Sequence, residues 1–369
     1  MKLGIIGKSA AGKTTLLSLI SSIPYESSLQ YQFERKLHFV TIKVSDERLN
    51  RIWQTNQDTE IIRTTLDIID TEPLLDSSER ESNNAVLTTL KETDGIISVI
   101  PCYQSKIDLN GIVREIDYIK TEIAMSDLTI VEKRLAKIEN PKGRANTPVE
   151  EIEEEKKFLL TLKEYIENGK DVKSIHLTRL SEKLCKNYGL LTLKPLIIIL
   201  NISEPALPFP TPSVRDEADR FDLAAKDSYK EVQAKYSYCV SLPLKLEYEI
   251  SLLSPEEQKS FLPDYGLKEL QKDEVIKTCY NALELWTFFT VGKGETRAWT
   301  IKKGDNIVTA AGRIHTDMAR GFIAAEVISL HDWFLGGSWK FAKEHGKLRS
   351  EGKEYIVNDG DIINVKFNI

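Results

Sequence analysis

Several short segments of the chain are almost wholly apolar and have the length of β-strands. They are Lys2–Ile6, Leu66–Ile69, Ile96–Ile100 and Leu196–Leu200, with Cys239–Leu242 as a weaker fifth. An apolar run in which polar residues do not alternate with apolar ones is typical of a parallel strand that is buried on both faces of its sheet. Helix-length segments such as Thr14–Ile23 and Ser82–Glu92 lie between these runs, whereas His38–Val44 indicates an edge or antiparallel strand. The alternation predicts an α/β domain whose mostly parallel sheet carries helices on both faces.

The stretch between the Ile96 and Leu196 runs is too long for a simple crossover, and its apolar residues recur at helical spacing. One stripe extends from Ile116 to Ile138 and a second from Ile152 to Ile166, with charged residues filling the gaps. Such spacing places one narrow apolar seam on each helix. The segment between them, 140–148, contains two prolines and a glycine and predicts a loop. We expect a helical hairpin over residues 112–185. Its charged residues form a solvated face, or the hairpin protrudes as a lever that contacts a large partner.

From Trp286 onward the predicted strands are separated by glycine-containing turns. The expected strands are Thr287–Thr290, Arg297–Ile301, Glu326–Ile328 and Ile362–Phe367, and the expected helix is Ile307–Ile314. Glycine and aspartate at the turns support this division. The pattern predicts a small α+β module over residues 284–369.

Composition narrows the class of protein. The 369 residues include 50 Lys+Arg against 56 Asp+Glu, which gives a formal net charge of -6. That balance argues against a uniformly basic nucleic-acid binder and against sequence-specific DNA binding, but it leaves room for a local basic patch. Four scattered cysteines show no metal-ligand spacing and fit a reducing cytosol. Because no apolar run is long enough for a signal peptide or a membrane span, we expect a soluble cytoplasmic protein without a membrane partner.

The strongest chemical signal is a phosphate-binding loop. Gly7–Thr14 matches G-x-x-x-x-G-K-[ST] directly after a strand pattern and before a helix pattern. The two glycines permit a tight turn that aims N–H groups at phosphates, and the helix adds the positive end of its dipole. The predicted nucleotide-binding residues are Gly7, Lys8, Ser9, Ala10, Ala11, Gly12, Lys13, Thr14 and Thr15. Lys13 and Thr14 are the catalytic candidates, since the lysine contacts the β- and γ-phosphates and the threonine hydroxyl ligates Mg²⁺. The alternative is a glycine-rich turn that binds nothing.

Two further polar segments follow predicted strands. Asp70 ends the strand that begins at Leu66, where P-loop proteins place an Asp that holds Mg²⁺, usually through water. Asn201-Ile202-Ser203-Glu204 leaves the Leu196 strand at the sheet edge where nucleotides bind. The alternative for Asp70 is an ordinary aspartate at the end of a strand that holds no metal. The alternative for Asn201–Glu204 is a polar segment that leaves a strand and binds no nucleotide.

Guanine-specific GTPases carry N-K-x-D at the second of these segments. Here Ile202 stands for the Lys and Glu204 for the Asp. Glutamate is one methylene longer, so its paired contact with guanine is out of register. We therefore predict weak guanine preference and favour ATP. GTP binding stays open because Glu204 is still a carboxylate.

Taken in order along nearly the whole chain, these residues resemble the YchF, or Obg-like ATPase, family. The matching segments are Gly7–Thr14, Thr121–Leu135, Leu191–Pro195, Asn201–Glu204 and, most specifically, Phe288–Ile301, Ala311–Asp317, Gly321–Ile323 and Gly346–Asp361. The resemblance implies a P-loop nucleotide-binding domain over 1–111 and 186–283, a coiled-coil hairpin over 112–185 and a TGS domain of β-grasp fold over 284–369. It also implies ATP in preference to GTP, Mg²⁺ as cofactor and association with ribosomes.

The chain departs from the family pattern at three places. The family P-loop reads G-x-P-N-V-G-K-S, and Ser9 and Ala10 replace its Pro and Asn, which argues against potassium activation. The switch I threonine is missing around residues 34–36. In switch II, D-x-x-G becomes Asp70-Thr-Glu-Pro73, and proline has no N–H and a fixed φ. One lost charge-assisted hydrogen bond costs about 1.5–3 kcal/mol, so we expect binding to survive better than turnover.

Three functional hypotheses follow. The first is an ATP-binding regulator that associates with the ribosome or another translation component and hydrolyses ATP slowly. The second is a ribosome- or RNA-binding scaffold with a vestigial nucleotide site, which uses a basic edge formed by Lys343, Lys347, Arg349 and Lys353. The third is a GTP-binding protein. In the first and third, the segments Tyr31–Val44 and Thr71–Asn84 are expected to move over the nucleotide.

Overall fold

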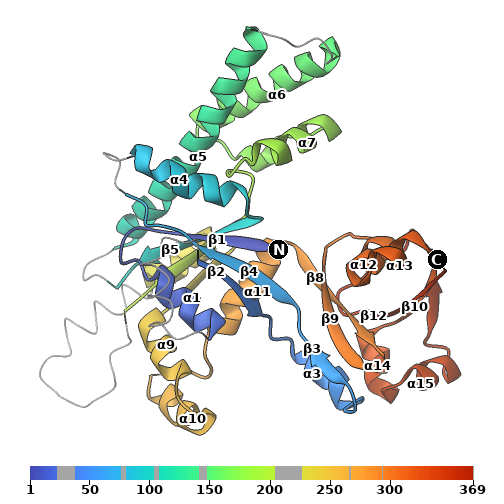
Figure 1. Ribbon diagram of the computed structural model, residues 1–369. Coiled ribbons are helices and arrows are strands. Elements are labelled where there is room, and N and C mark those ends of the chain that lie inside the picture. The colour runs from blue at the N-terminus through green and yellow to red at the C-terminus, as the bar shows by residue number, and fades with distance from the viewer. Residues whose placement is uncertain are drawn as a thin grey trace, which may run out of the picture. The chain divides into compact units, whose positions relative to one another are not determined.

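A computed structural model describes most of the chain as two compact units (Figure 1). The described residues are 1–22, 38–75, 80–103, 108–140, 148–203, 227–265, 267–292 and 294–368. Unit 1 comprises Met1–Val40 and Asp67–Val275, and unit 2 comprises Thr41–Leu66 and Ile276–Ile369. The domains expected from the sequence place residues 41–66 and 276–283 in the nucleotide-binding domain, whereas the structure groups both segments with the C-terminal residues. Residues 41–66 add a helix and a strand to unit 2.

Unit 1 is organised by a sheet with the strand order β2-β4-β1-β5-β6-β7. The strands are β1 Lys2–Ile6, β2 His38–Lys43, β4 Thr65–Asp70, β5 Gly95–Pro101, β6 Leu196–Asn201 and β7 Cys239–Leu242. β1 pairs in parallel with β4 and β5, and β5, β6 and β7 continue the parallel arrangement. The five apolar runs are thereby confirmed as strands of a parallel sheet, and β2 lies at its edge as expected.

The helices of unit 1 cover this sheet and extend beyond it. They are α1 Lys13–Ser21, α4 Arg80–Lys91, α5 Leu109–Glu139, α6 Val149–Glu167, the 3₁₀ helix η2 Val172–Ser174, α7 Arg179–Tyr188, α9 Leu244–Ser251 and α10 Pro255–Asp264, while α11 Lys272–Ala282 crosses the division between the units. Residues 227–235 are also helical. The main core forms where Ile96 and Ile100 of the sheet meet Leu90 of α4 and Ile112 and Ile116 of α5. Within the described ranges, no helix combines the length and apolarity needed to cross a bilayer.

The long helix α5 belongs to two cores in succession. Its first half packs on the sheet, and its second half packs against α6 and α7 (Figure 1). In the second core, Val131 and Leu135 of α5 meet Phe158, Leu159 and Leu162 of α6, all of them buried. The two predicted helices are confirmed. Val131, Leu135, Leu159 and Leu162 of the predicted stripes lie in this core, whereas Leu128 and Ile152 are only partly buried and Phe158 was not predicted. Residues 141–147 of the predicted loop lie outside the described residues.

Unit 2 contains a second, mixed sheet with the order β11-β10-β12-β8-β9-β3. Its strands are β3 Glu60–Ile62, β8 Leu285–Val291, β9 Glu295–Lys302, β10 Phe322–Ile328, β11 Arg349–Glu351 and β12 Ile362–Phe367, and its helices are α3 Glu47–Gln54, α12 Ile307–Ile314, α13 Thr316–Arg320, α14 Leu330–Gly336 and α15 Trp339–Glu344. Phe288, Ile301, Ile307 and Val327 are buried in its core. The four predicted strands and the predicted helix are present, whereas α3, β3, β11 and α13 to α15 were not expected.

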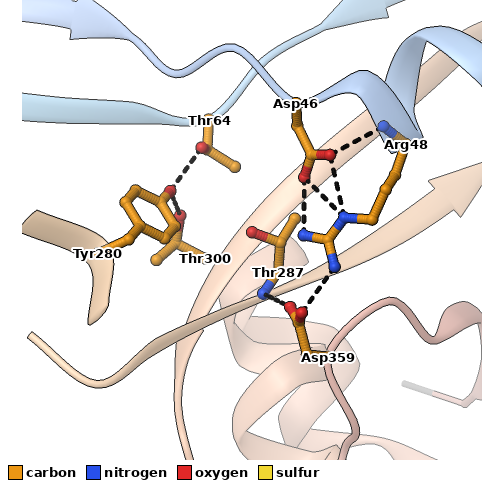
Figure 2. Close-up of polar contacts among 7 residues, drawn as sticks. All are labelled: Asp46, Arg48, Thr64, Tyr280, Thr287, Thr300 and Asp359. Carbon is orange, nitrogen blue, oxygen red and sulfur yellow. Dashed lines mark hydrogen bonds and ion pairs between the residues drawn. The ribbon is translucent and has the colours of Figure 1, made fainter. Parts of the chain in front are cut away.

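Polar contacts attach residues 46–64 to the rest of unit 2 (Figure 2). β3 pairs in parallel with β9. Arg48 Nη1 lies 2.6 Å from Asp359 Oδ2, which comes from the turn before β12. The hydroxyls of Thr64 and Tyr280 are 2.7 Å apart, and Tyr280 also lies 2.8 Å from Thr300. The segment therefore folds as an integral part of unit 2.

Candidate nucleotide-binding site

The predicted phosphate loop connects β1 to α1, and its two motif glycines are required by close packing. A Cβ on Gly7 would lie 2.7 Å from the carbonyl oxygen of Val99 in β5. Gly12 has a φ of +102°, and a Cβ there would lie 2.6 Å from Asn201 Nδ2. Gly12 is also the N-cap of α1, and no side chain caps this helix. The first N–H groups of α1 therefore remain available to an anion.

Lys13 lies inside the loop that it closes. Its Nζ donates hydrogen bonds to the carbonyl oxygens of Gly7 at 3.1 Å and Lys8 at 3.3 Å, and the residue is 7 % exposed. Burial lowers the pKa of the Lys13 ammonium, and the nearby charge of Asp70 raises it. An ammonium held by two carbonyl oxygens at the helix start provides a positive charge for a phosphate chain.

Thr14 and Asp70 meet at the carboxyl end of β4, as the sequence predicted. Thr14 Oγ1 donates a hydrogen bond of 3.4 Å to Asp70 Oδ2, and Asp70 is 6 % exposed. A hydroxyl and a carboxylate are the oxygen donors that Mg²⁺ prefers, so these two residues fit a magnesium site. Ser9 is exposed and Thr15 is half-buried.

Asn201 braces the loop from the end of β6. Its Nδ2 donates to the carbonyl oxygen of Ala11 at 3.0 Å, and its Oδ1 accepts from the N–H of Leu244 at 3.3 Å. Ile202 is partly buried and packs against the main core of unit 1. Glu204 lies outside the described residues, so its contact with a base stays a prediction. The partner Leu244 was missed because no motif marks the start of α9.

Helix α5 contacts the phosphate loop, a feature that sequence reasoning missed. Lys8 Nζ lies 3.1 Å from Glu115 Oε1 and 4.9 Å above the ring of Tyr118. The Tyr118 hydroxyl donates to the carbonyl oxygen of Leu75, whose N–H donates to Asn83 Oδ1 at 2.9 Å. Glu115 and Tyr118 are three residues apart on one helix face, which is the signal that could have found them. One helix thus contacts both the phosphate loop and the segment that follows Asp70.

The described part of switch II is hydrogen-bonded to β1 and to the phosphate loop. The N–H of Leu74 donates to the carbonyl oxygen of Gly7 at 3.0 Å. Thr71 Oγ1 donates to the carbonyl oxygen of Ile5 at 2.6 Å. Pro73, between them, has no N–H to offer a phosphate. The predicted switch I departures at residues 34–36 lie outside the described residues, as do 76–79.

The proposed basic edge of the C-terminal module is partly neutralised within unit 2. Lys347 Nζ lies 3.2 Å from Asp332 Oδ1. Arg349 lies 3.4 Å from both Glu351 and Asp361. These contacts offset part of the positive charge of Lys347 and Arg349, two of the four cations in the scaffold hypothesis.

Comparison with known proteins identifies the family. The "Ribosome-binding ATPase YchF" of Bacillus subtilis (strain 168) is 33% identical over 375 residues, which cover 99% of this chain and 99% of that protein. The chain belongs to the YchF family. YchF relatives of the same description from Mycoplasma genitalium and Escherichia coli O157:H7 are 32% and 31% identical, again over 99% or more of both chains.

Two further comparisons agree with the YchF assignment. A family model named YchF-GTPase_C, described as "Protein of unknown function (DUF933)", matches residues 285–368. The structure of the Schizosaccharomyces pombe YchF GTPase superposes with a TM-score of 0.77 at 23% identity, covering 99% of this chain and 97% of that one. This likeness shows that the two proteins share the α/β fold with mixed sheets and helices.

Proposed function

We propose that this chain is an ATP-binding regulator of the YchF type that associates with the ribosome and hydrolyses ATP slowly. The observation that carries the proposal is the geometry of the loop Gly7–Thr14, in which the buried Lys13 closes the turn and Thr14 faces Asp70. Full-length relatives that are named ribosome-binding ATPases support the choice of nucleotide and partner. A ribosome partner in turn favours a cytoplasmic location.

The residues of the phosphate loop and of the strand ends beside it have different roles in this proposal. The N–H groups from Gly7 to Thr15 bind the phosphates, and Lys13 places its charge on the β- and γ-phosphates. Thr14 and Asp70 hold Mg²⁺, which neutralises charge on the phosphates when it is bound. Asn201 keeps the loop in its binding conformation through Ala11. Ile202 and Glu204 replace the guanine-reading residues, which favours ATP over GTP.

The remaining parts of the chain supply the contacts to translation components. We assign residues 112–185 to a coiled-coil hairpin, since α5 and α6 pack through one apolar seam. We assign residues 284–369 to a TGS domain of the β-grasp type, because strands β8, β9, β10 and β12 share one core with α12. RNA is a further candidate partner of these parts.

Slow hydrolysis follows from switch II. Pro73 replaces a glycine whose N–H would reach the γ-phosphate, and the next N–H, of Leu74, is bonded to Gly7. A missing hydrogen bond to a charged group reduces stabilisation of the transferred phosphate by about 1.5–3 kcal/mol. Binding relies on the loop and is therefore affected less than turnover.

Calorimetric titration with ATP and GTP, with and without Mg²⁺, tests the nucleotide assignment. We expect magnesium-dependent ATP binding that is tighter than GTP binding and is lost in Lys13→Ala. Failure of both nucleotides to bind would favour the scaffold with a vestigial site, and tighter GTP binding would overturn the base assignment. Co-sedimentation with ribosomes in the presence of ATP or ADP tests the partner separately, since a scaffold would sediment equally with either.

A further inference from the structure

Unit 1 contains a second pocket, which is separate from the phosphate loop. Its volume is about 580 Å³, and its floor includes Ile96 of β5 and Leu196 of β6 at the beginnings of these strands, with Tyr238 just before β7. The phosphate loop follows the carboxyl end of β1, which is parallel to β5. Because the beginnings of parallel strands gather at one edge of the sheet and their carboxyl ends at the other, the pocket and the loop lie at opposite edges.

Buried polar contacts hold one wall of this pocket in place. Asp127 of α5 is 0 % exposed and accepts hydrogen bonds from the N–H groups of Leu191 at 3.0 Å and Thr192 at 2.8 Å. Lys194 Nζ donates to the carbonyl oxygens of Leu90 and Lys91, each at 2.7 Å, at the end of α4. Residues 191–194 therefore form a fixed wall, and Lys194 is committed to that wall and unavailable to a ligand.

Three other lysines line the pocket and come from three different segments. Lys120 comes from α5, Lys173 from the 3₁₀ helix η2, and Lys235 from the end of the helix 227–235. Lys120 Nζ lies 4.4 Å from the ring centre of Tyr236, and Lys235 Nζ lies 5.5 Å from the same ring. Throughout the part of the chain that the structure describes, none of these three lysines forms an ion pair within 4.0 Å. By contrast, Lys170 on the same rim is paired with Glu164 at 2.9 Å.

The side chains that line the pocket carry an excess of positive charge, since Asp171 is the single acidic residue among the described residues of the lining and several lysines accompany it. Burial lowers the pKa of Lys120; among its charged neighbours, Asp117 and Asp171 raise the pKa, and Lys235 and Lys173 lower it. An anion that binds between Lys120, Lys173 and Lys235 would be attracted by this excess of positive charge. The arrangement is therefore complementary to a ligand that carries more than one negative charge.

We propose that this pocket binds a small phosphate ester of nucleotide size, with its phosphate held by Lys120, Lys173 and Lys235. A volume of about 580 Å³ lies in the range of small-molecule sites. Ile123 and Tyr238 offer apolar surface to the body of the ligand, and ammonium groups suit a phosphate. A pocket of this volume suits a free ligand of nucleotide size better than a nucleic-acid chain.

This site is independent of the proposed function, because none of its residues belongs to the phosphate loop. The experiment uses the full chain carrying Lys13→Ala, which silences the loop, and titrates it calorimetrically with 5′-AMP, inorganic phosphate and hexauridylate. We expect 5′-AMP and phosphate to bind. Triple replacement of Lys120, Lys173 and Lys235 by Ala should weaken 5′-AMP binding roughly 30-fold or more, and replacement of the same three by Arg should restore it.

A matched triple variant with Lys133, Lys137 and Lys186 changed to Ala provides the control, since these lysines are exposed in unit 1 and do not line the pocket. Its affinity for 5′-AMP should be unchanged. In a second measurement, 5′-AMP should slow acylation of Lys120, Lys173 and Lys235, read by mass spectrometry, but not of the control lysines. The proposal is overturned by absent 5′-AMP binding, by equal losses in the two Ala triples, or by binding of hexauridylate alone.

Discussion

The side-chain amide of Asn201 donates a hydrogen bond of 3.0 Å to the carbonyl oxygen of Ala11 and so joins the end of β6 to the phosphate loop. The same side chain accepts the N–H of Leu244 at 3.3 Å, and Asn201 is 8 % exposed. The residue that the sequence associated with the base therefore also supports the phosphate-binding backbone. This double role makes its effect on binding testable apart from base choice.

Asn201→Ala should weaken the binding of ATP and GTP by similar factors, because the change acts on the loop that both nucleotides share. It leaves two buried backbone groups without their partner, which costs about 1–3 kcal/mol of unfolding free energy. Calorimetric titration and thermal unfolding measure the two effects. Ser203→Ala, at an exposed neighbouring position, serves as control and should change neither. Loss of GTP binding alone would show that Asn201 acts only on the base.

Glu247 of α9 gives the chain a pH-dependent stability. It is 0 % exposed, and its carboxyl accepts the N–H of Gln271 at 2.8 and 3.0 Å. Burial raises the pKa of Glu247 to about 7, against the lowering effect of hydrogen bonds from Gln271 and Lys272 and of the Lys272 charge. The folded state thus holds a proton that the unfolded state releases near pH 4.5. The stabilisation is complete below that pH and is lost as the pH rises to about 7.

Glu247→Gln should remove this dependence. The unfolding free energy of the wild-type chain should fall relative to the variant by on the order of 3 kcal/mol between about pH 4.5 and about pH 7. Chemical denaturation at a series of pH values measures the difference. Glu249→Gln on the exposed face of the same helix is the control and should leave the pH profile unchanged. A constant difference between wild type and Glu247→Gln would contradict the raised pKa.

The parts of the fold that were predictable are those fixed by local patterns. β1 and β5 were visible as apolar runs, and the phosphate loop was visible because Gly7 and Gly12 occupy fixed places in a motif. The contacts of Lys8 with α5 could not be read, since they join residues more than 100 positions apart. Likewise, β3 has three residues and depends on pairing with β9, so no local signal distinguishes it from a loop. Such features depend on contacts between distant parts of the chain, which the local spacing of apolar residues does not reveal.

Ala10 has a left-handed backbone conformation, with a φ of +56°. This conformation costs a residue with a Cβ about 1–2 kcal/mol, and glycine avoids the cost. Because glycine also gains freedom in the unfolded chain, Ala10→Gly should raise the unfolding free energy by a net of about 0.5–1 kcal/mol. Ala11→Gly is the control, since Ala11 is 1 % exposed and does not have a positive φ. Ala11→Gly should lower the unfolding free energy. If both variants raised it, strain at Ala10 would be excluded as the cause of the gain.

The ion pair of Arg48 and Asp359 should contribute to the attachment of residues 46–64 within unit 2 (Figure 2). Burial by itself would lower the pKa of Arg48, but hydrogen bonds to Asp46 and Asp359 raise it. The two side chains are 32% and 40% exposed, so solvent reduces their attraction. A double-mutant cycle with Arg48→Ala and Asp359→Asn should give a coupling of about 0.5–1 kcal/mol in thermal unfolding.

The pair Lys340 and Glu344 provides the matched control for that cycle. Its charges are 3.9 Å apart on one turn of α15, and the side chains are 85% and 57% exposed. Its cycle should give a coupling close to zero. Equal couplings in the two cycles would mean that the Arg48 contact contributes no more than an ordinary surface pair.

Pro73 should limit ATP turnover because it cannot donate a hydrogen bond to the γ-phosphate. Pro73→Ala restores the N–H, and Pro73→Gly restores both the N–H and the backbone freedom. The restored bond is worth about 1.5–3 kcal/mol, so single-turnover hydrolysis should accelerate about tenfold or more in Pro73→Gly, with ADP affinity little changed. A similar gain in Pro73→Ala would assign the defect to the N–H, and a gain only in Pro73→Gly would assign it to rotation. Unchanged rates in both variants would show that Pro73 does not limit hydrolysis.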